Sequence, residues 1–391
     1  MRIAGVVAEY NPFHLGHAYH LRRAREATGA DWVVGVMSTC FVQRGEAALL
    51  SPVDRARMAL AAGVDAVVAL PCLWSVRDAE HFALGGVALL DGLGVDVLSF
   101  GAETAELPLL ALAAELLEAP DEAFQAAVRR HLAAGMPHPA ALSAAAEEAR
   151  PGLGALLDAP NNTLGVCYLR AIKRLGSRMD VLSIAREGDY RATALPQGMP
   201  SSTAVRGALL RGDWHHACQA IPPAAEEILR RAALDGRLHR PDALDQALLA
   251  RLRMMDEAAY RALPGLSEGL ELRLREAARH AASREALLNA AKTRRYPRAR
   301  LARLCVHALL GVTQADMDAT PLPPAALLLG FRPGAEPLLA RLARGRLPLL
   351  TRAADYPQAR WLALEALAYD LWGLPCGLPA GMLYTQGLAR G

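Results

Sequence analysis

Five short apolar runs alternate with helical segments along the first half of this chain, at residues 3–8, 32–37, 66–70, 95–100 and 181–185. The residues between them have apolar positions at helical spacing, notably at 15–28, 52–62 and 76–93, and a longer helical stretch extends from about 103 to 148. Continuous apolar runs separated by helices indicate a parallel sheet that is covered on both faces. Residues 1–210 are therefore predicted to form a doubly wound, Rossmann-like α/β domain. Such domains bind ligands at the carboxyl ends of their strands.

The second half of the chain has a different pattern. From about residue 222 to 343, Ala, Leu, Arg and Glu recur at helical spacing and strand-like runs are few, although residues 348–351 are a candidate for a short strand. The sequence therefore predicts a mostly α-helical C-terminal domain over residues 211–391.

Composition narrows the class of protein further. Hydrophobic residues make up 53% of the 391 residues and charged residues 21%, which favours a globular fold over a disordered chain. The six cysteines form no CxxC pair, so neither a zinc knuckle nor a disulfide framework is indicated, and scattered thiols fit a reducing cytosol. No apolar stretch approaches the ~20 residues that span a bilayer, and the first apolar run is too short for a signal peptide. We expect a soluble, cytoplasmic protein away from membranes, and no stable protein partner is indicated.

The strongest functional signal is an HxGH motif that follows the first apolar run and begins the first helix. A helix N-terminus presents unpaired N–H groups and a partial positive charge, which suits phosphate, and Gly16 allows a ligand to approach the backbone. His14 and His17 are three residues apart and can project towards one point. Two imidazoles there would donate hydrogen bonds to the phosphates of ATP as charge builds during attack at the α-phosphorus. The alternative is a pair of histidines that merely cap the helix, and the strand–turn–helix setting favours the nucleotide site over it.

The segment Ser-Ser-Thr-Ala-Val-Arg at residues 201–206 supplies a second helix start. Its serines are good N-cap residues, and Arg206, one turn into the helix, would hold the departing pyrophosphate. Alone, this segment would be an ordinary capped helix with a solvated arginine; the HxGH motif makes it a partner of the site.

Three further segments lie where strands or loops end, which is where binding residues concentrate. Gly101 follows the fourth strand, and Arg186 with Glu187 and Gly188 closes the fifth. Asn161 and Asn162 precede a helix and would either cap it or contact the nucleotide.

These residues lie in segments that resemble the tRNA(Met) cytidine acetate ligase family of the HxGH nucleotidyltransferase superfamily. The matching segments of the first half are VVAEYNPFHLGH, MSTCFVQRGE, SFGAE, APNNTLGVCYL, REGDY and SSTAVR, and those of the second half are GLSEGLELRL, KTRRYPRARLARL and LLGFRPGAEPLL. They occur in the family's order and cover most of the chain.

The resemblance implies an ATP-dependent ligase with a two-step reaction. Acetate attacks ATP to give acetyl-adenylate and pyrophosphate, and the acetyl group then passes to N4 of the wobble cytidine (position 34) of elongator tRNA(Met). His14 and His17 are then the expected catalytic residues, and Mg²⁺ is expected with the triphosphate, without an indicated protein metal site. Together with the segment of residues 201–206, the resemblance gives the expected ATP-binding residues: Val7, Ala8, Glu9, Tyr10, Asn11, Pro12, Phe13, His14, Leu15, Gly16, His17, Ala18, Tyr19, His20, Gly101, Asn161, Asn162, Arg186, Ser202 and Arg206.

The chain departs from the family pattern at Pro52, where a lysine is common, and at residues 38–41, where Ser-Thr-Cys-Phe replaces Ser-Gly-Asn-Phe. Arg44 and Arg55 are the candidates to replace the charge of that lysine. Two other functions stay open at this point. One is an adenylyl- or cytidylyltransferase that acts on a small phosphorylated metabolite, and the other is an inactive relative that binds nucleotide and RNA.

No acidic residue occurs between Glu285 and Asp316, and six basic residues lie in that interval around Tyr296. A basic stripe with an aromatic residue suits an RNA backbone and one stacked base, whereas the alternative is a solvated helix face. The predicted tRNA-binding residues are Lys292, Arg294, Arg295, Arg298, Arg300 and Arg303.

Overall fold

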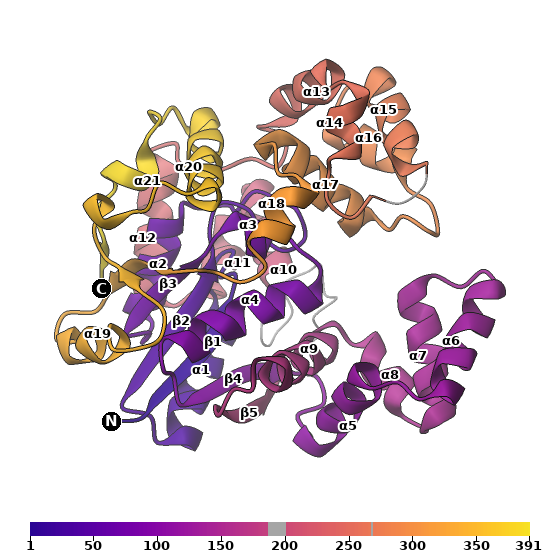
Figure 1. The fold of residues 1–391 in the computed structure, drawn as a ribbon. Helices are drawn as coiled ribbons and strands as arrows, with labels where there is room; N and C mark the ends of the chain where they lie inside the picture. Colours follow the sequence, from indigo (N-terminus) through magenta and orange to yellow (C-terminus); the bar gives the residue numbers. More distant parts are fainter. Residues whose placement is uncertain (187–200, 267–268) are drawn as a thin grey trace.

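The computed structural model describes residues 1–186, 201–266 and 269–391 (Figure 1). In that part of the chain the strands form one eight-stranded sheet with the order β5-β4-β1-β2-β3-β6-β7, and β8 pairs with β6. Five of them are mutually parallel: β1 (Ile3–Ala8), β2 (Trp32–Ser38), β3 (Ala66–Leu70), β4 (Val97–Ala102) and β5 (Asp180–Ala185). The chain leaves β1 towards β2 on one side and returns to β4 on the other. The doubly wound prediction is confirmed, and the reversal between β1 and β4 places a ligand crevice at their carboxyl ends.

Local sequence explains the helix boundaries on this sheet. Helix α1 (Leu15–Thr28) ends at Gly29, whose φ of 61° is the left-handed conformation that glycine adopts readily. Helix α2 (Pro52–Ala61) begins after Ser51, whose side chain accepts a hydrogen bond from the Asp54 N–H. The helix expected over residues 76–93 is confirmed as α4 (Ala79–Gly92), which begins three residues later than expected because Asp78 is its N-cap. A separate short helix, α3 (Cys72–Ser75), precedes it.

Five helices connect β4 to β5, and in Figure 1 α6 and α7 lie at one end of the molecule, away from the sheet. They are α5 (Leu107–Glu118), α6 (Glu122–Ala133), α7 (His138–Ala149), α8 (Leu153–Asp158) and α9 (Pro160–Leu175). Arg170 of α9 fastens this group to the sheet layer, because its guanidinium lies 3.0 Å from the Glu80 carboxylate of α4 and 2.9 Å from the Glu118 carboxylate of α5. Across the ranges that the structure describes, none of the helices has the length and apolar character needed to cross a membrane.

Helices dominate the chain after residue 200, as expected, and part of them builds a core of its own. The helices are α10 (Ser202–Leu210), α11 (Trp214–Gln219), α12 (Pro223–Leu234), α13 (Asp245–Met254), α14 (Glu257–Arg261), α15 (Leu270–His280), α16 (Arg284–Ala291), α17 (Arg298–Leu310) and α18 (Gln314–Ala319). Buried residues of α13 to α17 form a second hydrophobic cluster, separate from the cluster around the sheet. Helix α17 joins the two, since Val306 and Leu310 belong to the sheet cluster and Leu301 and Leu304 to the helical one.

The last 70 residues return to the sheet, which the sequence pattern did not predict. Strand β6 (Ala326–Phe331) pairs antiparallel with β3 and so covers the edge that β3 would otherwise expose. Strand β7 (Leu349–Leu350) confirms the short strand that was expected at this point. The remaining elements are α19 (Glu336–Leu342), the 3₁₀ turns at Ala353–Asp355 and Leu374–Cys376, α20 (Arg360–Gly373), α21 (Met382–Thr385) and β8 (Ala389–Arg390). Residues beyond about 325 therefore pack with the α/β layer, and the separate helical core covers only α13 to α17.

Candidate active site

A cavity of about 250 Å³ lies at the carboxyl ends of β1 and β4, where the fold predicts a ligand. Its walls come from the first turn of α1, a loop at residues 42–46, the start of α4, the start of α9 and the start of α10. The lining includes many of the residues expected from the sequence: Val7, Ala8, Glu9, Tyr10, His14, His17, His20, Gly101, Asn161, Arg186, Ser202 and Arg206.

His14 and His17 occupy the first turn of α1 and stack on each other, with ring centroids 3.7 Å apart. The Nδ1 atom of His14 accepts a hydrogen bond from the Gly16 N–H at 3.1 Å, and the Nδ1 atom of His17 accepts one from the His14 N–H at 3.2 Å. A ring nitrogen that accepts carries no proton, so each neutral imidazole has its N–H at Nε2. Capping and nucleotide binding are therefore compatible roles, because Nδ1 accepts a hydrogen bond from a backbone N–H of the first turn and Nε2–H remains available as a donor to a ligand.

The imidazoles of this cavity are held in the neutral form. Burial lowers the pKa of His14 to about 3, with smaller contributions from the positive charges of Arg186 and Arg206. Burial likewise brings the pKa of His17 well below its ordinary value, and that of His20 to about 4. At neutral pH these rings act as uncharged donors, and arginines supply the positive charge of the site.

Helix α10 brings Arg206 against the HxGH turn. Ser201 caps this helix by accepting from the Ala204 N–H at 3.1 Å, as its sequence predicted. The Arg206 guanidinium donates to the Asn11 carbonyl at 2.6 Å and lies 3.6 Å from the Glu46 carboxylate. The starts of α1 and α10 thus lie beside each other at one cavity. The first N–H groups of α1 are already bonded within the protein, Leu15 to the Ala220 carbonyl and Gly16 to His14. The imidazoles and the Arg206 guanidinium, rather than these N–H groups, are therefore the donors that this corner offers to an anion.

Gly101 and Arg186 meet at the ends of β4 and β5. A Cβ atom at Gly101 would lie 3.1 Å from the Arg186 Cγ, so glycine lets the arginine side chain lie across the strand end. Both line the cavity. Glu187 and Gly188, which were grouped with Arg186 in the sequence, lie outside the described residues.

The two asparagines at the start of α9 have different positions from those expected. Asn162 is 1% exposed, and its side-chain oxygen accepts from the Thr104 N–H at 2.9 Å, so it builds the wall without lining the cavity. Asn161 lines the cavity, and its amide donates to Glu103 at 2.6 Å. The capping alternative for this pair is wrong, because Ala159 is the N-cap residue and the Glu103 carboxylate accepts from the first N–H groups of the helix.

Several residues of the predicted ATP-binding stretch 7–20 do not line the cavity but pack around the residues that do. Asn11 is buried, and its side-chain oxygen accepts from the Leu49 N–H at 2.8 Å. The members that do not line the cavity are Asn11, Pro12, Phe13, Leu15, Gly16, Ala18 and Tyr19. Conversely, the cavity includes residues that sequence reasoning missed, among them Gln43, Glu46, Phe82, Phe100 and Tyr168. Gln43 and Glu46 lie in the family-like MSTCFVQRGE segment, the one signal that pointed near them.

Arg55 does not replace the lysine that the family commonly has near position 52. Its side chain is fully buried, and its guanidinium donates to the backbone carbonyls of Glu9 at 2.6 Å and Ser38 at 2.9 Å, as well as to Thr39. A further hydrogen bond runs from its Nε to the Leu50 carbonyl at 3.2 Å, so the guanidinium is held by four backbone carbonyls within the fold. Arg44 is exposed and lines the cavity, so of these two candidates it is the one placed to contact a phosphate.

The six basic residues of the predicted tRNA-binding stripe differ from one another in exposure and in their partners. Lys292, Arg294 and Arg295 are exposed. Arg298, in contrast, donates to the Glu285 carboxylate at 2.8 Å, so the interpretation of six uncompensated cations is wrong. Glu285 lies on α16 and Arg298 on α17, so the packing of these two helices brings together an acid and a base that are 13 residues apart in the chain.

Tyr296 does not serve as a stacking platform for a base. Its ring is 7% exposed, and the guanidinium carbons of Arg295 and Arg300 lie 5.7 and 5.5 Å from the ring centroid. Arg300 also donates to the Gly265 carbonyl at 2.7 Å. Arg303 is partly buried and faces Asp78, which leaves it turned towards the α/β layer.

Among the residues that the structure describes, no group of three His, Cys, Asp or Glu side chains is placed to hold a metal ion. The carboxylates that line the cavity are Glu9 and Glu46. Glu9 accepts from the Gln43 N–H at 2.7 Å, and burial raises the pKa of its carboxyl group.

Known proteins match this chain along its whole length. A family described as HIGH Nucleotidyl Transferase matches residues 1–377. A tRNA(Met) cytidine acetate ligase of Acetivibrio thermocellus is 32% identical, with 99% of each chain covered, and one of Syntrophotalea carbinolica is 38% identical over 90% of this chain and 85% of its own.

Solved structures agree with these sequence matches. The crystal structure of Thermotoga maritima TmcAL in its apo form I superposes with a TM-score of 0.93 at 28% identity, and the form II crystal bound with alpha-thio ATP superposes with a TM-score of 0.87, each covering both chains completely. The HxGH turn, the strand-end cavity and the full-length matches lead to one conclusion: this chain belongs to the tRNA(Met) cytidine acetate ligase family of the HIGH nucleotidyl transferases.

Proposed function

We propose that this chain activates acetate with ATP and transfers the acetyl group to N4 of the wobble cytidine of elongator tRNA(Met). The observation that carries the proposal is the pair of neutral imidazoles at the first turn of α1, which line a strand-end cavity together with Arg186 and Arg206. Relatives of similar length are named tRNA(Met) cytidine acetate ligase, and the Thermotoga maritima TmcAL crystal bound with alpha-thio ATP supports a nucleotide in this fold.

In the first step an acetate oxygen bonds to the α-phosphorus of ATP, and the bond from that phosphorus to the bridging oxygen breaks. The electron pair leaves with pyrophosphate. Negative charge therefore grows on the phosphate oxygens, and the Nε2–H groups of His14 and His17 are positioned to donate to them. Arg206 at the start of α10 would hold the departing pyrophosphate, and Arg44 adds a second cation at the same wall.

In the second step the N4 amine attacks the acetyl carbon and AMP leaves with the bonding electrons, while N4 loses a proton. No enzyme-bound acyl intermediate is required, so positioning and charge stabilisation are the contributions of the protein. His14, His17 and the lining residues of the cavity are the proposed site residues, and residues 1–210 are the proposed catalytic unit, completed by the strands from the C-terminal part.

Mg²⁺ is proposed to enter with the triphosphate. It usually binds through one or two carboxylates plus substrate phosphates and water, without a protein cage. Glu46 and Glu9 are the two carboxylates at the cavity wall that fit this donor set; Glu46 also lies 3.6 Å from Arg206, and one oxygen of Glu9 accepts from the Gln43 N–H. The ion would neutralise part of the phosphate charge.

The helical part after residue 210 is proposed to bind tRNA. Lys292, Arg294 and Arg295 are exposed on the connection between α16 and α17 and are the leading phosphate contacts. Arg298 and Arg300 lie next to them, each with a partner inside the protein. Arg303 faces the α/β layer and is therefore the member of the six that contributes least.

The test of this function uses purified protein, ATP, labelled acetate and bulk tRNA, followed by digestion to nucleosides. Label on cytidine that depends on ATP is the expected result. Exchange of labelled pyrophosphate into ATP separates the alternatives: dependence on acetate supports the proposal, and dependence on a phosphorylated metabolite instead supports a nucleotidyltransferase. Absence of exchange together with tRNA binding would support an inactive relative.

A further inference from the structure

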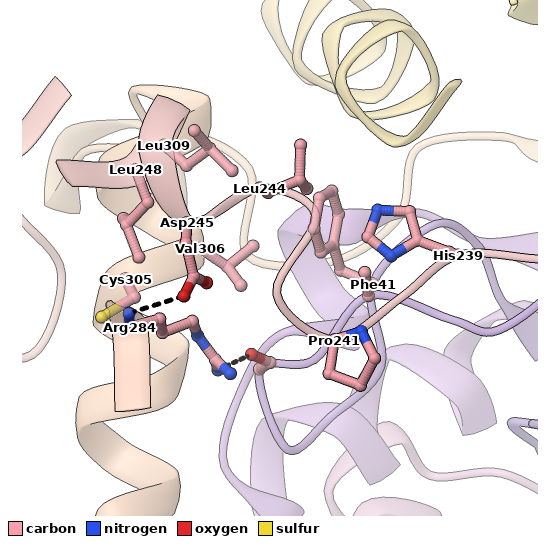
Figure 2. A pocket seen from close by; sticks show the side chains of 12 residues that line it. Phe41, His239, Pro241, Leu244, Asp245, Leu248, Arg284, Cys305, Val306 and Leu309 are labelled. Carbon is pink, nitrogen blue, oxygen red and sulfur yellow. Dashed lines mark hydrogen bonds between the residues drawn. The ribbon is translucent and has the colours of Figure 1, made fainter. Parts of the chain in front are cut away.

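The loop of residues 42–46 is a wall of the nucleotide cavity on one side and a contact of the helical core on the other. Val42, Gln43, Arg44 and Glu46 line the cavity. Gly45 is the exception in this loop, since it lines a different, smaller cavity between the two hydrophobic clusters (Figure 2). The loop thus connects the active site with a second structural unit.

The Gly45 carbonyl accepts a hydrogen bond from the Arg284 guanidinium at the first residue of α16. Figure 2 shows this side chain extended across the small cavity towards the loop, with a second dashed line from the Arg284 N–H to the Asp245 carboxylate at 3.0 Å. Asp245 is buried, and its carboxylate holds the backbone of Arg284 while the arginine side chain reaches the loop.

The loop has no room to approach α17 more closely. Gly45 has a φ of 75°, and a Cβ atom at this position would lie 2.4 Å from the Ala302 carbonyl carbon and from the Arg303 nitrogen. Glycine is therefore required both by the left-handed backbone and by the contact with the helix. The loop also closes on itself, since the Val42 N–H donates to the Glu46 carbonyl at 2.9 Å and the Gly45 N–H to the Val42 carbonyl at 2.8 Å. These two hydrogen bonds tie Gly45 to Val42 and Val42 to Glu46, so a contact at Gly45 bears on the cavity-lining residues of the same loop.

We infer that Arg284 is a positioning residue for the nucleotide cavity: by holding the Gly45 carbonyl it fixes residues 42–46 as a wall of that cavity. Arg284 itself lies outside the cavity and touches no substrate. The inference deepens the proposed function and rests on it for the identity of the ligand, ATP. It also gives the helical core of α13 to α17 a part in the first half-reaction, before tRNA is involved.

The test compares ATP dissociation constants of the full-length wild type and its variants by calorimetry with MgATP, in the absence of acetate and tRNA. Arg284→Ala removes the donor, and we expect ATP binding to weaken about tenfold, at the low end for a lost hydrogen bond to a charged group. Arg284→Lys retains a cationic donor and should recover most of the affinity. Arg279→Ala is the matched control, because Arg279 is an exposed arginine of the same helical core that pairs with Glu276 and does not contact the loop.

A thermal unfolding curve for each variant separates lost affinity from lost folding. Should Arg284→Ala fail to fold, Arg284→Met keeps an apolar stem in the small cavity, removes the donor to the Gly45 carbonyl, and is expected to weaken ATP binding by a similar factor. Wild-type affinity in either Arg284→Ala or Arg284→Met would overturn the inference, and so would an equal loss in Arg279→Ala. A wild-type protein that binds no ATP would instead refute the proposed function itself.

Discussion

Replacement of His14 by asparagine separates the two roles of this side chain. The His14 Nδ1 caps α1 by accepting from the Gly16 N–H at 3.1 Å, and an asparagine side-chain oxygen accepts in the same way. With that oxygen at the cap, the asparagine NH2 group lies closer to the backbone than the imidazole Nε2–H and does not reach its position. His14→Asn should therefore keep the helix start and lose the contact with the phosphates.

The expected magnitudes follow from these two contacts. Loss of one positioned donor to a developing charge costs roughly 3–4 kcal/mol, or about 10²–10³ in kcat. Because asparagine is among the best N-cap residues, the free energy of unfolding should change by less than about 0.5 kcal/mol. His14→Ala loses the donor and the cap, so its kcat should fall equally while its unfolding free energy drops by a further ~1 kcal/mol.

Acetate-dependent exchange of labelled pyrophosphate into ATP measures the first quantity, and urea unfolding at the same pH measures the second. The reasoning is refuted if His14→Asn retains exchange within tenfold of wild type, since the imidazole would then be a cap alone. Equal unfolding free energies for the asparagine and alanine variants would show instead that the hydrogen bond to Gly16 contributes nothing.

Three more expectations follow from the same structure. Burial lowers the pKa of His20 and of His307 to about 4 from 6.5. Between those two pH values the unfolded chain therefore binds more protons than the folded protein, so the contribution of these histidines to stability should be complete above pH ~6.5 and decrease as the pH falls towards 4. Urea unfolding at pH 7.5 and at pH 5 would measure this decrease. Lys292→Gln combined with Arg294→Gln should weaken tRNA binding and reduce its log–log salt slope by about 2, with ATP affinity unchanged, in filter binding at several salt concentrations; an unchanged slope would remove these residues from the interface. Arg55→Ala should cost about 3 kcal/mol or more of unfolding free energy, because four backbone carbonyls lose a buried charged donor; a urea midpoint close to that of wild type would contradict this.

Much of the fold and of the site's outline could be predicted because the signals are local. The alternation of apolar runs and helices specifies a parallel sheet, and the bounds of β1, β3 and α1 match those expected from the sequence. The HxGH turn and the serines at 201 and 202 are helix-start signals within a few residues, so their placement at two helix N-termini required no knowledge of the rest of the chain.

The errors concern contacts between distant segments. Arg55 is of a residue type that often binds phosphate, yet the fold buries it and pairs its guanidinium with four backbone carbonyls. Tyr296 looked available for a base, and two arginines cover it. The pairing of Arg298 with Glu285 and the capping of α9 by Glu103 arise from residues that are distant in sequence and adjacent only after folding.

The sequence by itself determined the class of sheet, the two helix starts and the family of this chain, because each depends on residue types at fixed short spacing. Only the tertiary structure decided which side chains line the cavity, that β6 completes the sheet, and that Arg284 reaches Gly45 across 239 positions. The physical reason is that the burial and the hydrogen bonds of a residue depend on its neighbours in space. Many of those neighbours come from distant parts of the chain, and a local sequence pattern does not show which parts will meet.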